Sequence, residues 1–478
     1  MVRTRFAPSP TGTMHVGNLR TALYAYLFAK TNGGKFVLRV EDTDKEREVM
    51  GAVDKIYSTL KLAGIEFDES PSVGGAFGPY MQSERLSIYG DYAKKLISLG
   101  GAYYCFCDKE RLDTLNNENG IRKYDKRCLA LSTKEVQEKL KKGAPYVIRQ
   151  NMPTAGESSY IDLVYGEITV PAKELEDNVL LKSDGYPTYN FANVIDDYLM
   201  QITHVMRGSE YLSSTPKYNL IYKAFGWEEP KYAHLPAIMK DKTRKLSKRH
   251  GDANFEDFYE KGFLPEAIIN YIALLGWSPK NHQEKLTLKE LVSLFSIDGI
   301  NKSGAIFDEE KLKWLNGLYI KEMEFKNFVN FCKPYLKKAG VLDKFDTNKL
   351  CALLQTRINF GEEIIEKVAF LNSFENYNLN LFANQKMKTD KELAKVNLTF
   401  ALEELKALPC FDKENINNAI AAASEKAGIK KGQMMYMLRV SLTGAETSPG
   451  GASEMAEMLG KEETLKRLSY SINYLLQN

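Results

Sequence analysis

The chain has 478 residues, and its 65 Lys and Arg against 62 Asp and Glu leave a net charge of only +3. Hydrophobic residues make up 44% and charged residues 27%, values typical of globular proteins, which excludes a largely disordered chain. At about 150 residues per domain, the length favours about three domains. Proteins that act mainly on nucleic acid often have a larger basic excess, although a near-neutral total can hide a basic face.

Two further classes are excluded by segments that the sequence lacks. The most apolar stretch, residues 268–276, is too short to cross a bilayer, so we expect no membrane partner. The charged residues 1–12 are not followed by an apolar segment, so we expect no signal peptide. Six cysteines do not make a disulfide scaffold, and we expect reduced thiols in a cytoplasmic protein.

The first forty residues predict a strand, a loop, a helix and a second strand. Residues 3–7 are a short extended run that two prolines and Gly12 interrupt. Apolar residues at helical spacing follow over 19–30, and residues 35–40 (KFVLRV) are typical of a strand. Such a unit usually places its two strands in parallel, joined by a right-handed crossover.

Composition changes along the chain predict five segments. Three cysteines and short strand candidates distinguish an insertion from the α/β pattern on either side, and strand signals become rare in the C-terminal third. We predict a first half of an α/β domain at 1–102, an inserted domain at 103–181, the second half at 182–253, a connecting helical domain at 254–322 and an all-helical region with two subdomains at 323–478.

The first chemical motif, PSPTGTMHVGN at residues 8–18, lies between the first predicted strand and helix. Ligands of open α/β sheets bind beyond the carboxyl ends of the strands, and helix N-termini offer N–H groups that suit phosphate. Gly12 and Gly17 permit a close backbone approach, and His15 adds a hydrogen-bond donor. The alternative is that the prolines and glycines only form a loop and that His15 caps the helix.

The second motif is a basic run at residues 240–249. It holds six basic residues and one acid, Asp241, and ends in KLSKR at 245–249. Mobile lysines can stabilise the charge on a phosphoryl group during its transfer. The alternative is a solvated basic loop or an electrostatic patch for RNA.

Together the two motifs resemble the signature pair of the class I aminoacyl-tRNA synthetases, in the same order and at a similar separation. HVGN at 15–18 resembles the "HIGH" sequence, and KLSKR at 245–249 resembles "KMSKS". RFAPSPTG at 5–12, RVEDTD at 39–44 and DGYPTYNFANVIDD at 184–197 further resemble the glutamyl/glutaminyl branch. The resemblance is specific over the first two thirds of the chain and weaker in the helical remainder.

Within that branch, the C-terminal part distinguishes the subfamilies. Glutaminyl and eukaryotic-type glutamyl enzymes carry β-barrel anticodon domains, whereas this sequence predicts helices, as in the bacterial glutamyl-tRNA synthetases. The resemblance therefore implies an α/β Rossmann-like catalytic domain with an α/β insertion, followed by an all-α anticodon-binding region. It implies a monomer that activates L-glutamate with ATP and Mg²⁺ in a tRNA-dependent step. The glutamyl group would then pass to the 3′ terminal adenosine of tRNA(Glu).

The resemblance also implies roles for individual residues. The catalytic groups would be His15, Lys245 and Lys248. ATP would be bound by these three together with Gly17, Asn18 and Ser247. Glutamate would be bound by Arg5, Ala7, Ser9, Glu41, Tyr189, Asn193 and Arg207, and tRNA would be contacted by Arg47 and Arg357.

The residues that the resemblance assigns to glutamate binding have charges complementary to those of glutamate. Arg5 and Arg207 would pair with the side-chain carboxylate, and Glu41 with the α-ammonium group. A fork-shaped guanidinium suits a carboxylate, and neutral glutamine would leave that buried charge without its partner. The alternatives are a surface arginine on a strand for Arg5, a helix cap for Glu41 and a helix-surface arginine for Arg357.

Three cysteines in the predicted insertion suggest a metal site. Cys105 and Cys107, followed by Cys128 in YDKRC, resemble the zinc site in the acceptor-binding insertion of some family members. Structural zinc takes four ligands, usually thiolate or imidazole. Ala130 stands where a histidine would complete the set, so Tyr124 would be the fourth ligand. The alternative is three thiols without metal.

Three other functions stay open from sequence. One is an enzyme of the same branch, either a glutaminyl-tRNA synthetase or a non-discriminating glutamyl enzyme that also charges tRNA(Gln). Another is a nucleotidyltransferase that forms small-molecule adenylates without RNA, which the large helical region disfavours. The third is a non-enzymatic helical RNA scaffold, which the intact pair of motifs disfavours.

Overall fold

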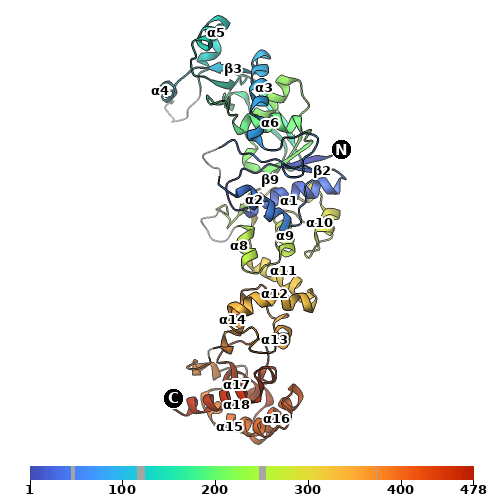
Figure 1. Ribbon diagram of the computed structural model, residues 1–478, viewed down its shortest axis with the longest axis vertical. Helices are drawn as coiled ribbons and strands as arrows, with labels where there is room; N and C mark the ends of the chain where they lie inside the picture. The colour runs from blue at the N-terminus through green and yellow to red at the C-terminus, as the bar shows by residue number, and fades with distance from the viewer. Residues whose placement is uncertain (45–48, 116–123, 247–253, 373, 478) are drawn as a thin grey trace. The chain divides into compact units, whose positions relative to one another are not determined.

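The fold was obtained as a computed structural model (Figure 1). It describes residues 1–44, 49–115, 124–246, 254–372 and 374–477. Internal contacts divide the chain into two units: unit 1, with residues 1–259 and 268–308, and unit 2, with residues 260–267 and 309–478.

Unit 1 begins with the strand–helix–strand motif that the sequence predicts. β1 (Arg3–Phe6) and β2 (Lys35–Leu38) pair in parallel, and α1 (Val16–Thr31) connects them. The apolar residues of α1 at helical spacing, such as Leu19 and Leu23, are fully buried because this face of the helix packs against the strands. The predicted parallel pair is therefore confirmed.

A second sheet has the strand order β6-β5-β9-β8. Its strands are β5 (Glu157–Asp162), β6 (Gly166–Pro171), β8 (His204–Gly208) and β9 (Lys231–Leu235). β9 pairs in parallel with both of its neighbours, while β5 and β6 form an antiparallel hairpin. A hairpin from the predicted insertion thus extends the sheet that contains β8 and β9.

The two sheets meet where β1 runs beside β8. The Thr203 N–H donates to the Arg3 carbonyl over 3.0 Å, and the Arg5 guanidinium reaches the Met206 carbonyl over 3.3 Å. β1, β8 and β9 therefore run in one direction and end at the same edge. Ligands of α/β sheets bind at such an edge.

A third, antiparallel sheet lies in the predicted insertion. It consists of β3 (Ala102–Cys105), β4 (Val147–Gln150) and β7 (Val179–Leu181). Its apolar residues share a core with α3 (Leu86–Ser98) and α6 (Tyr189–Leu199). This core holds α6 beside the edge where β1 ends, while the finer domain boundaries inside unit 1 stay a prediction.

Shorter elements complete the chain up to residue 308. They are α2 (Ala52–Leu62), α4 (Lys109–Asp113), α5 (Thr133–Lys141), α7 (Thr215–Phe225), α8 (Phe255–Glu260), α9 (Pro265–Leu274), α10 (Leu288–Leu294), β10 (Ile238–Met239) and β11 (Ala305–Ile306). Two of them, α8 and α9, extend into the residues 260–267 of unit 2. None of the helices in the described ranges has the length and apolar character that crossing a membrane would require.

Unit 2 is helical, as the sequence predicts. Its main helices are α11 (Glu309–Glu322), α12 (Phe325–Lys338), α13 (Thr347–Leu354), α14 (Glu363–Val368), α15 (Lys391–Ala407), α16 (Lys413–Lys426), α17 (Lys431–Thr443) and α18 (Ala452–Gln477). α15, α17 and α18 pack side by side around a shared apolar core (Figure 1). Gly460, with φ +79° and ψ 167°, interrupts α18 with a backbone conformation that suits glycine.

A buried ion network joins α6 to the strands of unit 1. Asp196 accepts hydrogen bonds from Arg85 Nε (2.7 Å), Gln82 Nε2 (2.8 Å) and the Tyr89 hydroxyl (2.8 Å). The next residue, Asp197, accepts from arginines of two further segments, described below. Asp196 is completely buried, so its charge depends on these partners for stabilisation.

We therefore expect Asp196→Asn to destabilise the protein strongly. The neutral amide leaves the buried Arg85 guanidinium without its anion, and breaking a buried pair in this way costs about 3–5 kcal/mol. Urea denaturation followed by circular dichroism measures the loss. The control is Asp91→Asn, because the Asp91–Lys94 pair is exposed and its loss should change stability by at most about 0.5 kcal/mol. Equal stability of the two variants would contradict the prediction.

Candidate active site

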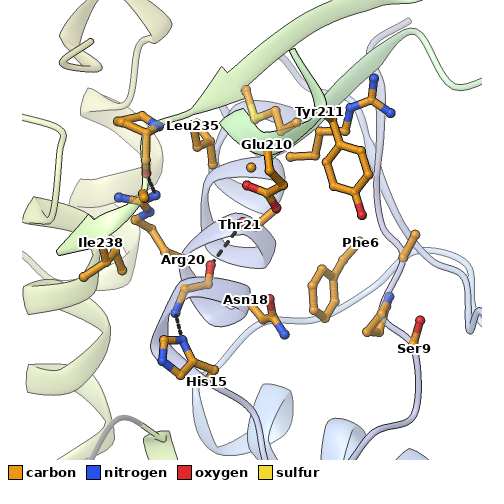
Figure 2. Close-up of a pocket in the computed structure, with 18 of the residues that line it drawn as sticks. Phe6, Ser9, His15, Asn18, Arg20, Thr21, Glu210, Tyr211, Leu235 and Ile238 are labelled. Atoms are coloured by element: carbon orange, nitrogen blue, oxygen red, sulfur yellow. Dashed lines mark hydrogen bonds between the residues drawn. The ribbon is translucent and has the colours of Figure 1, made fainter. Parts of the chain in front are cut away.

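A cavity of about 560 Å³ opens at the edge where β1, β8 and β9 end (Figure 2). Residues that the sequence predicts for the site line much of it: Arg5, Ala7, Ser9, His15, Gly17, Asn18, Glu41, Tyr189, Arg207 and Lys245. These residues come from segments more than 200 positions apart, and the parallel strands bring them together. Of the residues predicted to bind glutamate, Asn193 does not line this cavity.

His15 stands at the N-terminus of α1. Its Nδ1 accepts the Gly17 N–H over 3.0 Å, so the side chain caps the helix, as Figure 2 shows. A Cβ at Gly17 would lie 3.2 Å from this nitrogen, which makes any larger residue there a crowded one. The helix N-terminus, with its positive dipole end, therefore faces the cavity beside His15 and suits an anion.

The basic run reaches the same cavity. Lys245 lines it and is exposed, and the Leu246 N–H donates to the Ile238 carbonyl over 3.0 Å. Upstream, Arg244 pairs with Asp241 through a contact of 2.6 Å. Ser247 and Lys248, which the sequence assigns to ATP, lie outside the described residues.

Arg5 and Glu41 are held at the cavity by buried charges. Arg5 Nε donates to Asp197 over 3.1 Å, and Arg39 donates from one nitrogen to Asp197 (2.7 Å) and from another to Glu41 (3.0 Å). Burial by itself would raise the pKa of Asp197, but Arg5 and Arg39 lower it below its ordinary value. For Glu41 burial dominates, so its pKa is raised although Arg39 and Arg5 oppose the shift. Both predicted residues are thus buried site groups, and Arg5 is not a surface arginine.

Arg207 differs from Arg5 in its partners. The residue is 5% exposed, and its guanidinium lies between aromatic rings, 5.0 Å from the ring centre of Tyr211, 4.9 Å from that of Tyr218 and 5.4 Å from that of Tyr232. Burial lowers the pKa of Arg207, but the surrounding phenols outweigh burial and raise it, so the group is charged. Among the described residues, no carboxylate forms an ion pair with it. The cavity therefore contains a buried cation that is surrounded mainly by tyrosine rings and that forms no ion pair within the described residues.

Helical spacing explains how α6 contributes. Tyr189 and Asn193 are one turn apart, and Asp196 and Asp197 follow one turn later, so all four lie on one face. Tyr189 lines the cavity, with its ring 5.1 Å from that of Tyr211. Asn193 is buried and donates to the Tyr189 carbonyl, one turn back along the helix.

Several lining residues are not identified by the sequence motifs. Glu210 and Tyr211 point into the cavity from the side opposite His15 (Figure 2). They are the second and third residues after β8, and the rule that ligands bind at the carboxyl ends of strands could have found them. Arg20 and the segment from Leu235 to Ile238 also line the cavity.

A second cavity of about 660 Å³ adjoins the first. Four residues line both: Ser9, Glu41, Tyr189 and Tyr211. Lys182 and Gln82 are among the residues that line the second cavity and not the first. The two spaces together can hold a ligand larger than one nucleotide, with room for a second group beside Glu41.

The predicted metal ligands come together away from these cavities. The sulfur atoms of Cys105, Cys107 and Cys128 lie within 4.8 Å of one another. The Tyr124 hydroxyl is 3.3 Å from the Cys105 sulfur and 3.4 Å from the Cys107 sulfur. All four predicted ligand groups therefore converge on one point.

The structure describes one of the two arginines that are predicted to contact tRNA. Arg357 follows α13 with its side chain 42% exposed, donates to the carbonyls of Leu353 and Pro449, and lies 3.9 Å from Glu454. Arg47 lies outside the described residues.

Comparisons with known proteins agree with this arrangement. Residues 1–314 match the catalytic domain of the class I tRNA synthetases for E and Q, and residues 325–472 match an anticodon binding domain. The glutamate–tRNA ligases of Clostridium novyi and Clostridium tetani are 53% and 54% identical to the chain, with 99% of this chain and 98% of each relative covered.

The crystal structure of a glutamate tRNA ligase from Elizabethkingia meningosepticum, in complex with its amino acid, matches with a TM-score of 0.89. It is 36% identical, and the match covers 99% of each chain. The predicted fold class, an α/β Rossmann-like catalytic domain followed by an all-helical anticodon-binding region, is thereby confirmed. The chain belongs to the glutamate–tRNA ligases, a family of class I aminoacyl-tRNA synthetases.

Proposed function

We propose that this chain activates L-glutamate with ATP to glutamyl-adenylate and transfers the glutamyl group to the 3′ terminal adenosine of tRNA(Glu). The observation that carries the proposal is the buried Arg207 guanidinium, which lines the cavity and has no carboxylate partner in the part of the chain that the structure describes. A buried charge needs an opposite charge to stabilise it. The side-chain carboxylate of glutamate supplies one, and glutamine does not.

The rest of the cavity suits the other reactants. The Glu41 carboxyl group lines this cavity, and we assign to it the α-ammonium group of glutamate. The N-terminus of α1, His15 and Lys245 also line this cavity. His15, the backbone around Gly17 and Lys248 would bind the triphosphate of ATP, with Lys245 assisting. Mg²⁺ would enter with ATP as part of the substrate. Activation is an in-line displacement at the α-phosphorus, so positioning and charge stabilisation supply most of the catalysis.

The second step needs a nucleotide next to the adenylate. The adjoining cavity shares Glu41 and Tyr189 with the first, which supports it as the space for the terminal adenosine. The helical residues 325–472 would read the anticodon, with Arg357 among the contacts. A non-discriminating enzyme that also charges tRNA(Gln) is the second candidate, because the sequence motifs of unit 1 do not distinguish the two specificities. A monomeric state and a cytoplasmic location stay predictions.

We further propose that the cysteine cluster binds zinc. Zinc–sulfur bonds of about 2.3 Å in a tetrahedron place two sulfurs about 3.8 Å apart, and the Cys107 and Cys128 sulfurs are 3.6 Å apart. Arg149 Nε donates to the Cys105 sulfur over 3.3 Å and the Phe106 N–H to the Cys128 sulfur over 3.4 Å. These donors would offset the negative charge of three thiolates around one Zn²⁺. The ion would be structural, because four protein groups leave no open position.

Arg207→Gln tests the glutamate site. The substitution leaves the substrate carboxylate buried without a cation, so we expect kcat/KM for glutamate to fall at least about 100-fold. The KM for ATP should change less than about twofold, since we place the phosphate groups of ATP beside His15 and not beside Arg207. ATP–pyrophosphate exchange in the presence of tRNA(Glu) measures both. Lys223→Gln, an exposed change on α7, is the control. An unchanged KM for glutamate would refute the assignment of Arg207.

Exchange and charging assays test the tRNA requirement. We expect glutamate-dependent exchange only when tRNA(Glu) is present, and no charging of tRNA(Gln). Arg357→Gln should raise the KM for tRNA(Glu) about tenfold, because one lost arginine contact to a base costs about 1–3 kcal/mol. The KM for glutamate should not move. Charging of both tRNAs would establish the non-discriminating alternative, and exchange without tRNA would contradict the tRNA-dependent mechanism.

Metal analysis tests the zinc proposal. Protein purified without chelator should contain about one zinc per chain, and Cys128→Ser should reduce this below about 0.1 equivalent. Cys410→Ser, which removes an exposed thiol outside the cluster, should leave the zinc content unchanged. Wild-type protein with less than about 0.1 equivalent of zinc would favour three thiols without metal.

A further inference from the structure

A chain of three buried side chains crosses the sheet beneath the cavity. Asp162 ends β5, His234 lies in β9 and Arg207 lies directly opposite His234 in β8. His234 Nδ1 is 2.6 Å from Asp162 Oδ2, and Arg207 Nε donates to His234 Nε2 over 3.1 Å. His234 and Asp162 are 0% and 1% exposed, so neither can reach the substrate itself. Neither residue lines the cavity.

Asp162 determines which ring nitrogen of His234 carries the proton. Its Oδ1 accepts the N–H groups of Val164 and Tyr165, both over 2.9 Å, and its Oδ2 accepts the backbone N–H of His234 over 3.1 Å. Burial opposes ionisation, but these donors and the imidazole lower the pKa of Asp162 below its ordinary value. An ionised carboxylate only accepts, so His234 Nδ1 must be the donor. In a neutral ring, Nε2 is then the acceptor for Arg207.

The ring is neutral because of what surrounds it. Burial and the Arg207 charge lower the pKa of His234, and the negative charges of Asp162 and Glu210 oppose this only in part. The other faces of the ring meet Tyr160 and Tyr232, at 6.2 and 6.1 Å between ring centres. A proton on Nε2 would place two N–H donors face to face, one from His234 and one from Arg207, and two donors cannot form a hydrogen bond with each other.

We propose that Asp162 and His234 are positioning residues that hold the Arg207 guanidinium in the orientation that receives the side-chain carboxylate of glutamate. His234 takes the Nε–H, and Thr215 accepts from Nη2 over 2.6 Å, so two of the three nitrogens are fixed in the plane of the group. A guanidinium fixed in this way loses little freedom when it binds a carboxylate bidentately. The inference rests on the proposed role of Arg207 in glutamate binding.

Two amides in place of His234 separate the functions of its two nitrogens. In His234→Asn the amide can still donate to Asp162 but does not reach the position of Nε2. In His234→Gln the carbonyl oxygen can take that position and accept from Arg207. We expect the Asn variant to raise the KM for glutamate about 10- to 100-fold, the effect of losing one buried bond to a charged group. The Gln variant should recover most of this loss.

Asp162→Asn tests the relay from its other end. Whichever way its amide turns, an NH₂ group faces N–H donors, either those of His234 or those of Val164 and Tyr165. His234 then loses its fixed tautomer, and we again expect a raised KM for glutamate. The KM for ATP should stay within about twofold of wild type in every variant, as a residue acting only through Arg207 requires. His204→Gln, a histidine at the opposite end of β8, should behave like wild type.

Thermal denaturation and circular dichroism verify that each variant is folded before exchange is measured, and Asp162→Asn carries the test should His234→Asn not fold. Arg207→Gln is measured in the same series. If it raises the KM for glutamate while Asp162→Asn and His234→Asn do not, the relay is refuted and the role of Arg207 stands. If Arg207→Gln has no effect, the proposed glutamate site itself is refuted. Equal effects of Asn and Gln at position 234, or equal rises in both KM values, would also overturn the relay.

Discussion

Two neighbouring carboxylates on the last turn of α6, Asp196 and Asp197, hold the edge of the sheet where the cavity forms. Asp196 binds Arg85, and Asp197 binds Arg5 from β1 and Arg39 from the segment after β2. All these groups are almost completely buried, so each charge is stable only while its partners are in place. Helix and strands cannot shift independently, and the positions of the cavity residues follow from this constraint.

The two cavity arginines differ in whether a carboxylate of this network binds them. Asp197 already neutralises Arg5, so Arg5 contributes hydrogen-bond donors in a fixed place more than it contributes net charge. Arg207 has tyrosine rings, Thr215 and a neutral imidazole around it, and its positive charge stays available to a ligand. In the role that we propose for Arg207, a site with one paired cation and one that lacks a carboxylate partner among the described residues would select a substrate with one negative side-chain group. That selection would distinguish glutamate from glutamine.

Prediction from sequence succeeds where the signal is local or carried by a motif. The structure contains the predicted parallel pair β1–β2 and the predicted helical C-terminal region, and ten of the predicted site residues line the cavity. The motifs do not identify Glu210 or Tyr211, although these follow a strand whose carboxyl end reaches the cavity. Nor do they identify Asp162 and His234, because a buried aspartate and a buried histidine have no distinguishing pattern in a single sequence.

The sequence by itself determined the elements and the family. Alternation of apolar residues, the breaks at proline and glycine, and the two signature motifs are properties of short segments and need no knowledge of the fold. Only the tertiary structure decided which charges are paired. Arg5 of β1 pairs with Asp197 of α6, and Arg207 of β8 donates to His234 of β9, so each pair joins segments that are separated in the chain. Whether a cation is compensated depends on burial and on partners from other segments, which no local pattern encodes.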